Sequence, residues 1–216
     1  PKVATRQVEI GGSTITISGC CKGAGMIHPN MATLLAIVTT DAKVAPNVLH
    51  QALTAAANKS FNRISVDGDT STNDTLLLLA SGVSGVNIGE AELPAFQATL
   101  TELCIDLAKQ VARDGEGATR LVEIRVTGAA SEEQAHQVGN SIARSPLVKT
   151  AIHGGDPNWG RVLCAAGYSG ADIDPNRISL TFGPADRPGD KYDSPALQVL
   201  ANGLPYLLGN ERDKGS

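Results

Sequence analysis

Apolar and polar residues alternate over residues 6–18, RQVEIGGSTITIS, on both sides of Gly11 and Gly12. Alternation with a period of two is typical of a strand with one buried face, and a glycine pair between two such runs favours a tight hairpin turn. A later run at residues 34–40, LLAIVTT, is apolar, rich in β-branched residues and of strand length. The amino-terminal part is therefore predicted to form a hairpin followed by a buried strand.

Other stretches carry apolar residues three and four positions apart, the spacing that places them on one face of a helix. Helices are predicted at residues 46–61, 91–113 and 131–144, with shorter ones beginning at residue 147 and covering residues 161–168. Additional strands are predicted at residues 63–66, 119–127 and 177–182, and an apolar run covers residues 76–80. Because strands and helices do not alternate strictly along the chain, the predicted fold class is α+β.

Composition narrows the classes of function. The chain has 216 residues, a formal net charge of -4 and 3% aromatic residues. This length suffices for one domain with a sizeable core, and the lack of a basic stripe argues against nucleic acid as a partner. No apolar run is long enough to cross a membrane, and the amino end has no signal-peptide order. The four cysteines lack metal-binding spacing, so reduced thiols and a cytoplasmic location are predicted.

The candidate chemistry lies in residues 22–41, KGAGMIHPNMATLLAIVTTD, which join a glycine-rich turn, a threonine and an apolar strand. Gly23 and Gly25 free the backbone to take positive φ angles. Thr33 follows the small residue Ala32 and suits autoproteolysis, in which its hydroxyl attacks the Ala32 carbonyl and forms an ester. The freed amine of Thr33 then serves as base for its own hydroxyl. A tight turn into a core strand is the alternative for this dipeptide.

This segment resembles the precursor cleavage segment of the ornithine acetyltransferase family, also called glutamate N-acetyltransferase, whose self-cleaving signature is Lys-Gly-x-Gly-Met-Ile-x-Pro-Asn-Met-Ala-Thr. Matching motifs follow in the same order: VDGDTSTNDT (66–75), DGEGATR (114–120), LVKTAIHGGDPNWGR (147–161) and DPNRISL (174–180). The resemblance implies a self-processing N-terminal-nucleophile fold with two sheet layers between helices. It also implies that residues 1–32 end the α part and residues 33–216 form the β part.

The activity implied by the resemblance is acetyl transfer from N-acetylornithine to glutamate in arginine biosynthesis, by a ping-pong path through an acetyl-Thr33 ester. No metal or organic cofactor is expected, and His28, His50, His136 and His153 are predicted to be solvated or structural. Complementary α and β parts are expected to form an α2β2 heterotetramer. The sequence does not decide whether acetyl-CoA also serves as donor.

The resemblance also assigns roles in substrate binding. Lys22 matches a lysine that contacts substrate, and its cation suits the α-carboxylate that both substrates share. Glu116 matches a substrate-binding glutamate and could pair with the amino groups of ornithine. Without the resemblance, both residues would be interpreted as solvated loop residues. A supporting role for the polar loop near the nucleophile is predicted for Thr72, Asn73 and Asp74. Helix caps and turn-fixing groups are predicted at Asp156, Asn158 and Arg161.

The chain departs from the family pattern at both ends. The family carries a long preceding section with a Thr-Gly oxyanion pair, and a closing tail whose Asn and Thr or Ser reach the substrate. This chain instead ends QVLANGLPYLLGNERDKGS, and the sequence does not indicate a role for the residues after about Phe182. It is therefore interpreted as a middle piece of such an enzyme. Two alternatives stay open: a self-processing amide hydrolase or aminopeptidase, in which water takes the acyl group, and an inactive fragment.

Overall fold

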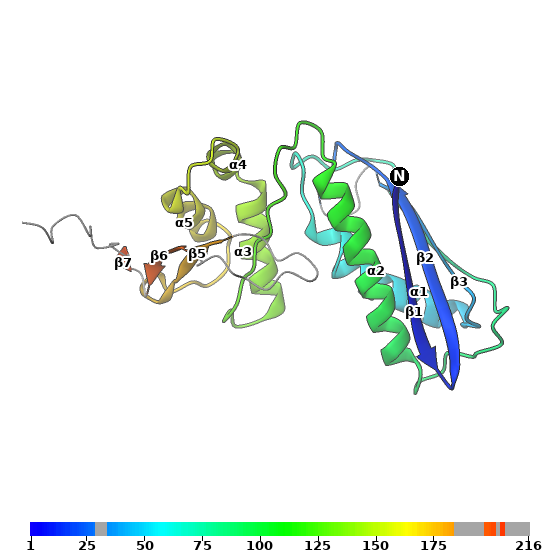
Figure 1. The fold of residues 1–216 in the computed structure, drawn as a ribbon. Helices are drawn as coiled ribbons and strands as arrows, with labels where there is room; N and C mark the ends of the chain where they lie inside the picture. Colours follow the sequence, from blue (N-terminus) through cyan, green and yellow to red (C-terminus); the bar gives the residue numbers. More distant parts are fainter. Residues whose placement is uncertain (29–33, 184–196, 202–203, 206–216) are drawn as a thin grey trace, which may run out of the picture. The chain divides into compact units, whose positions relative to one another are not determined.

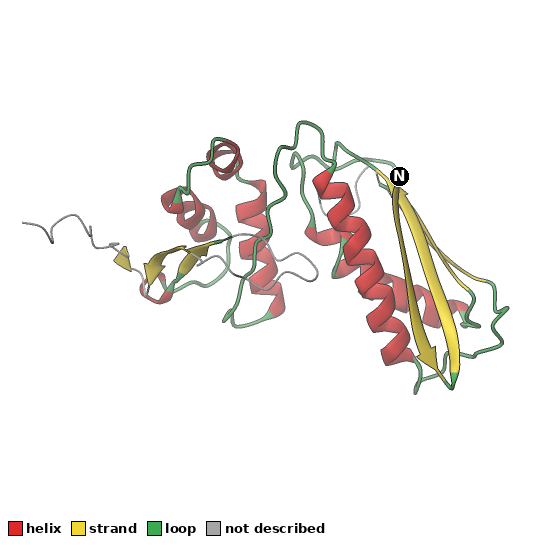
Figure 2. Ribbon diagram, viewed as in Figure 1, coloured by secondary structure: helices red, strands yellow, loops and turns green. Residues whose placement is uncertain are grey.

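A computed structural model describes residues 1–28, 34–183, 197–201 and 204–205. The chain divides into two compact units, Pro1–Leu121 and Val122–Ser216. The first contains β1 (Lys2–Ile10), β2 (Ser13–Lys22), β3 (Leu35–Thr40), α1 (Pro46–Asn58), a 3₁₀ helix (Phe61–Arg63), β4 (Thr75–Ala80) and α2 (Leu93–Arg113) (Figure 1). The second contains α3 (Glu132–Arg144), α4 (Pro146–His153), α5 (Trp159–Gly167), a 3₁₀ helix (Pro175–Arg177), β5 (Leu180–Phe182), β6 (Leu197–Ala201) and β7 (Leu204–Pro205) (Figure 2). The mixture of helices and strands confirms the predicted α+β class.

The first unit is built on a sheet with the strand order β1-β2-β3-β4. The predicted hairpin is β1 and β2, whose turn residues Gly11 and Gly12 have φ angles of 60° and 77°. Two consecutive positive φ angles are what a type I′ hairpin turn requires, and glycine adopts them without strain. The strand β3 pairs antiparallel with β2 and parallel with β4. Parallel neighbours need a crossover connection, and α1 lies within it.

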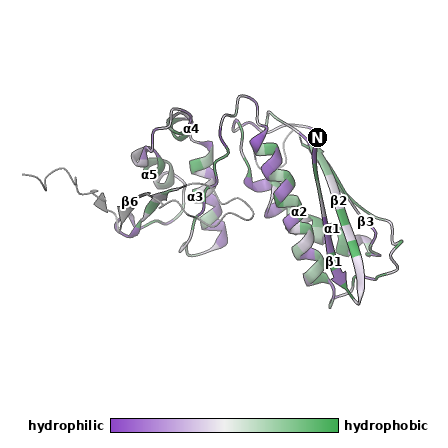
Figure 3. Cartoon of the chain, in the orientation of Figure 1, coloured by the Kyte–Doolittle hydropathy of each residue, from purple (hydrophilic) through white to green (hydrophobic). Residues whose placement is uncertain are grey.

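One face of this sheet packs on α2. Apolar side chains of β2 and β3 alternate inward and meet the buried side of the helix: Ile15, Ile17, Ala36 and Val38 from the strands, and Phe96, Leu100, Leu103 and Leu107 from α2. The predicted helix face is thus confirmed, and hydrophobic and hydrophilic segments alternate along α2 in Figure 3. Gly19 permits the close approach, because an added Cβ would lie 3.0 Å from Leu107 Cδ1.

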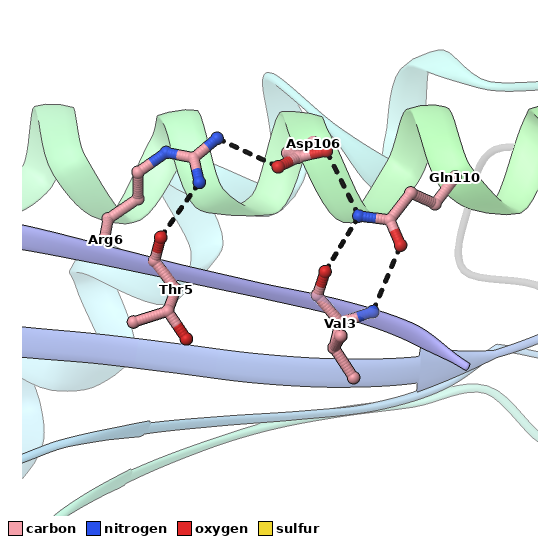
Figure 4. Close-up of polar contacts among 5 residues, drawn as sticks. All are labelled: Val3, Thr5, Arg6, Asp106 and Gln110. Atoms are coloured by element: carbon pink, nitrogen blue, oxygen red, sulfur yellow. Dashed lines mark hydrogen bonds and ion pairs between the residues drawn. The ribbon is translucent and has the colours of Figure 1, made fainter.

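Polar side chains of α2 also protect the free edge of the sheet. The amide of Gln110 donates to the carbonyl of Val3 at 3.0 Å and accepts from the Val3 backbone N–H at 3.1 Å (Figure 4). Arg6 and Asp106 form an ion pair at 2.9 Å beside it. Because β1 is an edge strand, its outward backbone groups would otherwise be open to pairing with another chain. The helix therefore covers this part of the edge.

The opposite face of the sheet carries exposed apolar side chains. Leu35 and Ile37 of β3 are 46% and 44% exposed, and Leu77 and Leu79 of β4 are 45% and 55% exposed. Ile37 and Leu77 are direct partners in the parallel register. We call these four residues the outer face of the sheet. Aliphatic side chains gathered in this way are typical of a surface that another layer covers.

The second unit packs three helices around a small core of Ile142, Val148, Val162, Ala165 and Ala166. Ser131 caps α3, since its side chain accepts a hydrogen bond from the Gln134 backbone N–H. Ser145 ends α3 and caps α4, and Pro146 occupies the first turn of α4. The strands β5, β6 and β7 form a separate sheet in that order.

Two predicted strands are wrong. Arg63 ends a 3₁₀ helix and residues 64–66 follow it outside any strand, where the Val66 N–H donates a hydrogen bond to the Ile27 carbonyl. Residues 119–127 are not a strand, although Ile124 and Val126 are half-buried between exposed neighbours. Alternation indicates which face is apolar, but a strand also needs a paired neighbouring strand, which the alternation itself does not specify. The predicted strand at 177–182 is shorter, and β6 and β7 were not predicted.

Candidate functional site

The candidate site lies at the end of the sheet where β2 ends and where β3 and β4 begin. Lys22 closes β2 and pairs in register with Leu35, which in turn pairs with Thr75. Lys22 is exposed and forms no ion pair with any described residue. Ala32 and Thr33, the predicted cleavage site and nucleophile, lie outside the described residues. The geometry of the site is therefore that of its two flanks, residues 23–28 and Leu34.

The glycine turn after Lys22 holds an unusual backbone. Gly23 has a φ angle of 154°, and Met26 has a φ angle of 50°, the one positive value at a non-glycine residue in the described ranges. Gly25 does not take a positive φ angle, so that expectation is wrong. Its lack of a side chain instead permits close approach, because an added Cβ would lie 2.9 Å from Glu116 Oε2 and 3.7 Å from Asp67 Oδ2.

Asp67 holds this turn through its carboxylate. Its Oδ2 atom accepts a hydrogen bond from the backbone N–H of Met26 at 2.6 Å, and its Oδ1 atom accepts from that of Ile27 at 3.0 Å. The Asp69 N–H also donates to Oδ1, at 3.1 Å. Hydrogen bonds from backbone N–H groups to a carboxylate are among the stronger ones in proteins. They oppose the tendency of Met26 to leave its left-handed conformation.

The same loop contacts the next residues along the turn. The Val66 backbone N–H donates to the Ile27 carbonyl at 2.7 Å. His28 is buried, and its Nδ1 atom lies 3.4 Å from the Ser65 hydroxyl. Residues 26–28 are thus held by residues 65–67, which lie about forty positions away in the sequence.

Glu116 reaches the glycine turn from the loop that follows α2. Its backbone N–H donates to the Ala24 carbonyl at 2.7 Å, and its side chain lies against Gly25. Gly115 packs closely on Val66, since an added Cβ would lie 2.9 Å from Val66 Cγ1. The structure therefore brings Glu116 next to the turn that begins after Lys22, and the role of these two residues in substrate binding stays a prediction.

Asp74 contacts the other flank of the predicted cleavage site. Its Oδ1 atom accepts a hydrogen bond from the Leu34 backbone N–H at 2.9 Å, and the Leu34 carbonyl accepts from the Thr75 N–H at 2.9 Å. Burial raises the pKa of the Asp74 carboxyl above its ordinary value, and the hydrogen bond from Leu34 opposes this rise. The Oδ2 atom is buried and has no partner among the described residues. Thr72 and Asn73 are exposed, so Asp74 is the residue of this trio that touches the flank.

Asp67 was missed by the sequence analysis although it lies in one of the matching motifs, VDGDTSTNDT. An aspartate before a glycine commonly accepts hydrogen bonds from nearby backbone N–H groups, and this local signal was available. Its contact with Met26 depends on a distant segment and has no signature in the sequence. The roles predicted for the later motif agree with the geometry: Asn158 caps α5, and Arg161 donates to the Leu147 carbonyl at 2.9 Å.

No metal or membrane-spanning feature stands out in the described part of the chain. Within the residues that the structure places, no group of three or more His, Cys, Asp or Glu side chains is arranged to hold a metal ion. Among those same residues, none of the helices combines the length and apolar character needed to cross a bilayer.

The architecture matches a solved structure, which defines the class of protein. The crystal structure of arginine biosynthesis bifunctional protein ArgJ from Bacillus halodurans superposes with a TM-score of 0.71 and 44% sequence identity, covering 79% of this chain and 76% of that one. The chain is thus an α+β protein of the same fold as that structure.

The sequence comparisons identify the family. The ArgJ family matches residues 1–213, beyond the range over which the motifs were seen. The mitochondrial arginine biosynthesis bifunctional protein ArgJ of Yarrowia lipolytica is 50% identical over 98% of this chain and 48% of the relative. The ArgJ protein of Symbiobacterium thermophilum is 53% identical over 85% of this chain and 46% of the relative. The chain belongs to the ArgJ family, and it spans about half the length of the curated relatives it matches.

Proposed function

We propose that this chain carries the nucleophile-bearing portion of an enzyme that transfers an acetyl group from N-acetylornithine to glutamate in arginine biosynthesis. Membership of the ArgJ family, whose relatives are named as bifunctional proteins of arginine biosynthesis, supports the pathway. The observation that carries the proposal is the arrangement at the two flanks of the Ala32–Thr33 bond. Residues 65–67 hold the chain before it, and Asp74 and Thr75 hold Leu34 directly after it.

The first reaction in the proposal is self-cleavage. The Thr33 hydroxyl attacks the carbonyl carbon of Ala32, its proton passes to the departing amide nitrogen, and the C–N bond breaks to leave an ester. The α-amine of Thr33 is freed when this C–N bond breaks. Water then hydrolyses the ester, which gives a carboxylate at Ala32 and restores the Thr33 hydroxyl. A threonine with a free amine can use that amine as the base for its own hydroxyl.

Acetyl transfer follows in two steps. The Thr33 hydroxyl attacks the acetyl carbonyl of N-acetylornithine, ornithine leaves with the proton, and an acetyl ester remains on Thr33. The amine of glutamate then attacks this ester. The product N-acetylglutamate departs, and the Thr33 hydroxyl is restored. Splitting one amide exchange into two acyl transfers lowers each barrier. The proposal uses no metal or organic cofactor and leaves open whether acetyl-CoA is a second donor.

Two charged residues are proposed to bind the substrates. Lys22 is exposed at the end of β2 and forms no ion pair with a described residue, so its cation is available for the shared α-carboxylate. Glu116 lies against Gly25 in the same turn and is available for the amino groups of ornithine. Asp74 supports the nucleophile through Leu34, and Thr72 and Asn73 complete the exposed part of that loop.

The complete enzyme is proposed to have the two-layered sheet of a self-processing N-terminal-nucleophile fold, with α and β parts in an α2β2 assembly. The exposed outer face of the sheet supports this, because a second sheet would remove its four aliphatic side chains from water. The α and β parts are defined by the proposed cut of the peptide bond between residues 32 and 33, and this bond lies within the first compact unit. The cytoplasmic location stays a prediction, since a fungal relative is named mitochondrial.

The first test is the intact mass of the purified chain beside Thr33→Ala and Thr33→Ser. We expect the native chain to yield two products that meet at Ala32 and Thr33, and Thr33→Ala to stay whole. Thr33→Ser keeps a hydroxyl and should still cleave. A native chain that stays whole, or a Thr33→Ala chain that still splits, would refute the self-cleavage. Formation of N-acetylglutamate from glutamate separates transfer from hydrolysis, in which water takes the acetyl group.

A further inference from the structure

One loop, residues 65–75, contacts the chain on both sides of the proposed cleavage site. On the amino side, Asp67 accepts hydrogen bonds from the backbone N–H groups of Met26 and Ile27, at 2.6 and 3.0 Å. On the carboxyl side, Asp74 accepts from the backbone N–H of Leu34 at 2.9 Å. In both places a carboxylate accepts hydrogen bonds from the backbone, although Asp67 is exposed and Asp74 is half-buried.

The backbone on the amino side of the site depends more on the Asp67 carboxylate than the backbone on the carboxyl side depends on the Asp74 carboxylate. Leu34 directly precedes β3, and its carbonyl accepts a hydrogen bond from the Thr75 N–H, so the sheet helps to place it. Residues 24–28 belong to no strand or helix, and Met26 has a φ angle of 50°. A non-glycine residue adopts such an angle at a cost that neighbouring contacts must offset. Asp67 supplies two of those contacts directly.

Other charged groups near the turn do not share this task. The Glu116 side chain approaches Gly25, but its hydrogen bond to the turn comes from its backbone N–H, which any residue except proline could provide. Asp69 also contributes only its backbone N–H, which donates to Asp67, and its carboxylate is exposed. Asp67 is therefore the side chain on which the conformation of the turn depends most.

We propose that Asp67 is a positioning residue for self-cleavage: it holds Met26 and Ile27, which precede the Ala32–Thr33 bond in the chain, in the backbone conformation on which cleavage depends. The inference rests on the proposed function, because it concerns the same cleavage. Asp67 does not touch the reacting atoms. It acts through the backbone, and small errors in the placement of reacting groups slow a reaction strongly.

The test measures how fast the full chain carrying Asp67→Asn cleaves. The uncleaved precursor is purified first, and its cleavage is then monitored over time by intact mass. Asparagine offers one acceptor oxygen and one NH₂ group, so at least one backbone N–H would face another donor in either orientation of the amide. We expect cleavage to slow by about tenfold or more. Asp69→Asn is the matched control, because it removes the same charge from the same loop and should cleave at the native rate.

A compensating change separates positioning from a general loss of stability. Glycine adopts the φ angle of Met26 without strain, and the Met26 side chain is 52% exposed, so little packing is lost. We therefore expect Asp67→Asn combined with Met26→Gly to recover part of the lost rate. All variants are measured at a temperature at which circular dichroism shows them folded. Hydrogen exchange should increase at Met26 and Ile27 in Asp67→Asn, with the amides of β2 and β3 unchanged.

Each outcome bears on a different statement. If Asp67→Asn cleaves as fast as the native chain, or if Met26→Gly restores nothing, Asp67 is not a positioning residue and the proposed function is untouched. If the native chain itself stays whole, self-cleavage fails for this chain, and the role of Asp67 in it fails too. A slow Asp67→Asn chain, a native-like Asp69→Asn chain and partial recovery with Met26→Gly together support the inference.

Discussion

At the scale of single residues, the two carboxylates that contact the cleavage flanks differ in how well they could be predicted. Asp74 was selected because a polar loop beside a nucleophile needs internal support, and its bond to Leu34 fits that interpretation. Asp67 contacts residues about forty positions earlier, and no local pattern reports such a pairing. Residue identity predicts what a side chain can bind, but the partner depends on the path of the backbone between them.

Gly25 illustrates the same limit. A positive φ angle, the commonest reason for a glycine in a turn, was expected at this residue from the sequence. The structure explains it by the Glu116 carboxylate, which would lie 2.9 Å from an added Cβ. The residue type was correctly singled out, and the physical reason could be found only when both loops were placed.

The cysteines give a prediction at this scale. Burial raises the pKa of the Cys21 thiol to about 11 and that of Cys104 to about 12, whereas Cys20 and Cys164 are exposed. Only the thiolate reacts with disulfide reagents, so the two buried thiols should be unreactive at pH 8 for reasons of both charge and access. In the native protein we expect two thiols to react with Ellman's reagent, and all four after denaturation. Rapid reaction of Cys104 in the folded chain would contradict this.

At the scale of elements, helices were predicted better than strands. A helix contains its own hydrogen bonds, so the apolar spacing of residues 93–113 is almost sufficient to predict α2. A strand needs a neighbour, which explains why the alternation at residues 119–127 predicted a strand that the structure does not contain. The hairpin was predicted correctly because Gly11 and Gly12 supply the turn that brings its two strands together.

The contact between α2 and β2 gives a prediction for this scale. An added Cβ at Gly19 would lie 3.0 Å from Leu107 Cδ1 and 3.2 Å from both Leu103 Cδ2 and Val38 Cγ2. All three atoms belong to a packed core, so Gly19→Ala should lower the free energy of unfolding by about 1–3 kcal/mol. Urea denaturation measures this. Cys20→Ala, an exposed position on the same strand, should change the free energy by less than about 0.5 kcal/mol, and equal effects would contradict the explanation.

At the scale of the whole molecule, the length of the chain suggested one domain, and the structure contains two compact units. Composition and length bound the size of a core but do not show where contacts are sparse along the chain. Each unit has its own apolar cluster, and the residues that form the candidate site all lie in the first. The cleavage proposed between residues 32 and 33 therefore divides one unit, not the link between two.

This division leads to a prediction about the cleaved protein. Residues 1–32 would contain β1 and β2, whereas β3, β4 and both helices of the first unit would belong to the other product. The two products would still share the β2–β3 ladder, the buried side chains that meet α2 and the hydrogen bonds of Gln110 with Val3. A shared sheet and core do not depend on the peptide bond that is cut, because every one of these contacts is non-covalent.

We therefore expect both products to elute together in native size-exclusion chromatography and to separate in guanidinium chloride, with masses that meet between Ala32 and Thr33. Gln110→Ala should weaken the association, since it leaves the backbone N–H and C=O of Val3 without their side-chain partner at the edge of the sheet. Its effect should appear as earlier dissociation during a denaturant titration. Loss of residues 1–32 from the native protein immediately after cleavage would show that the shared sheet and core do not hold the two parts together.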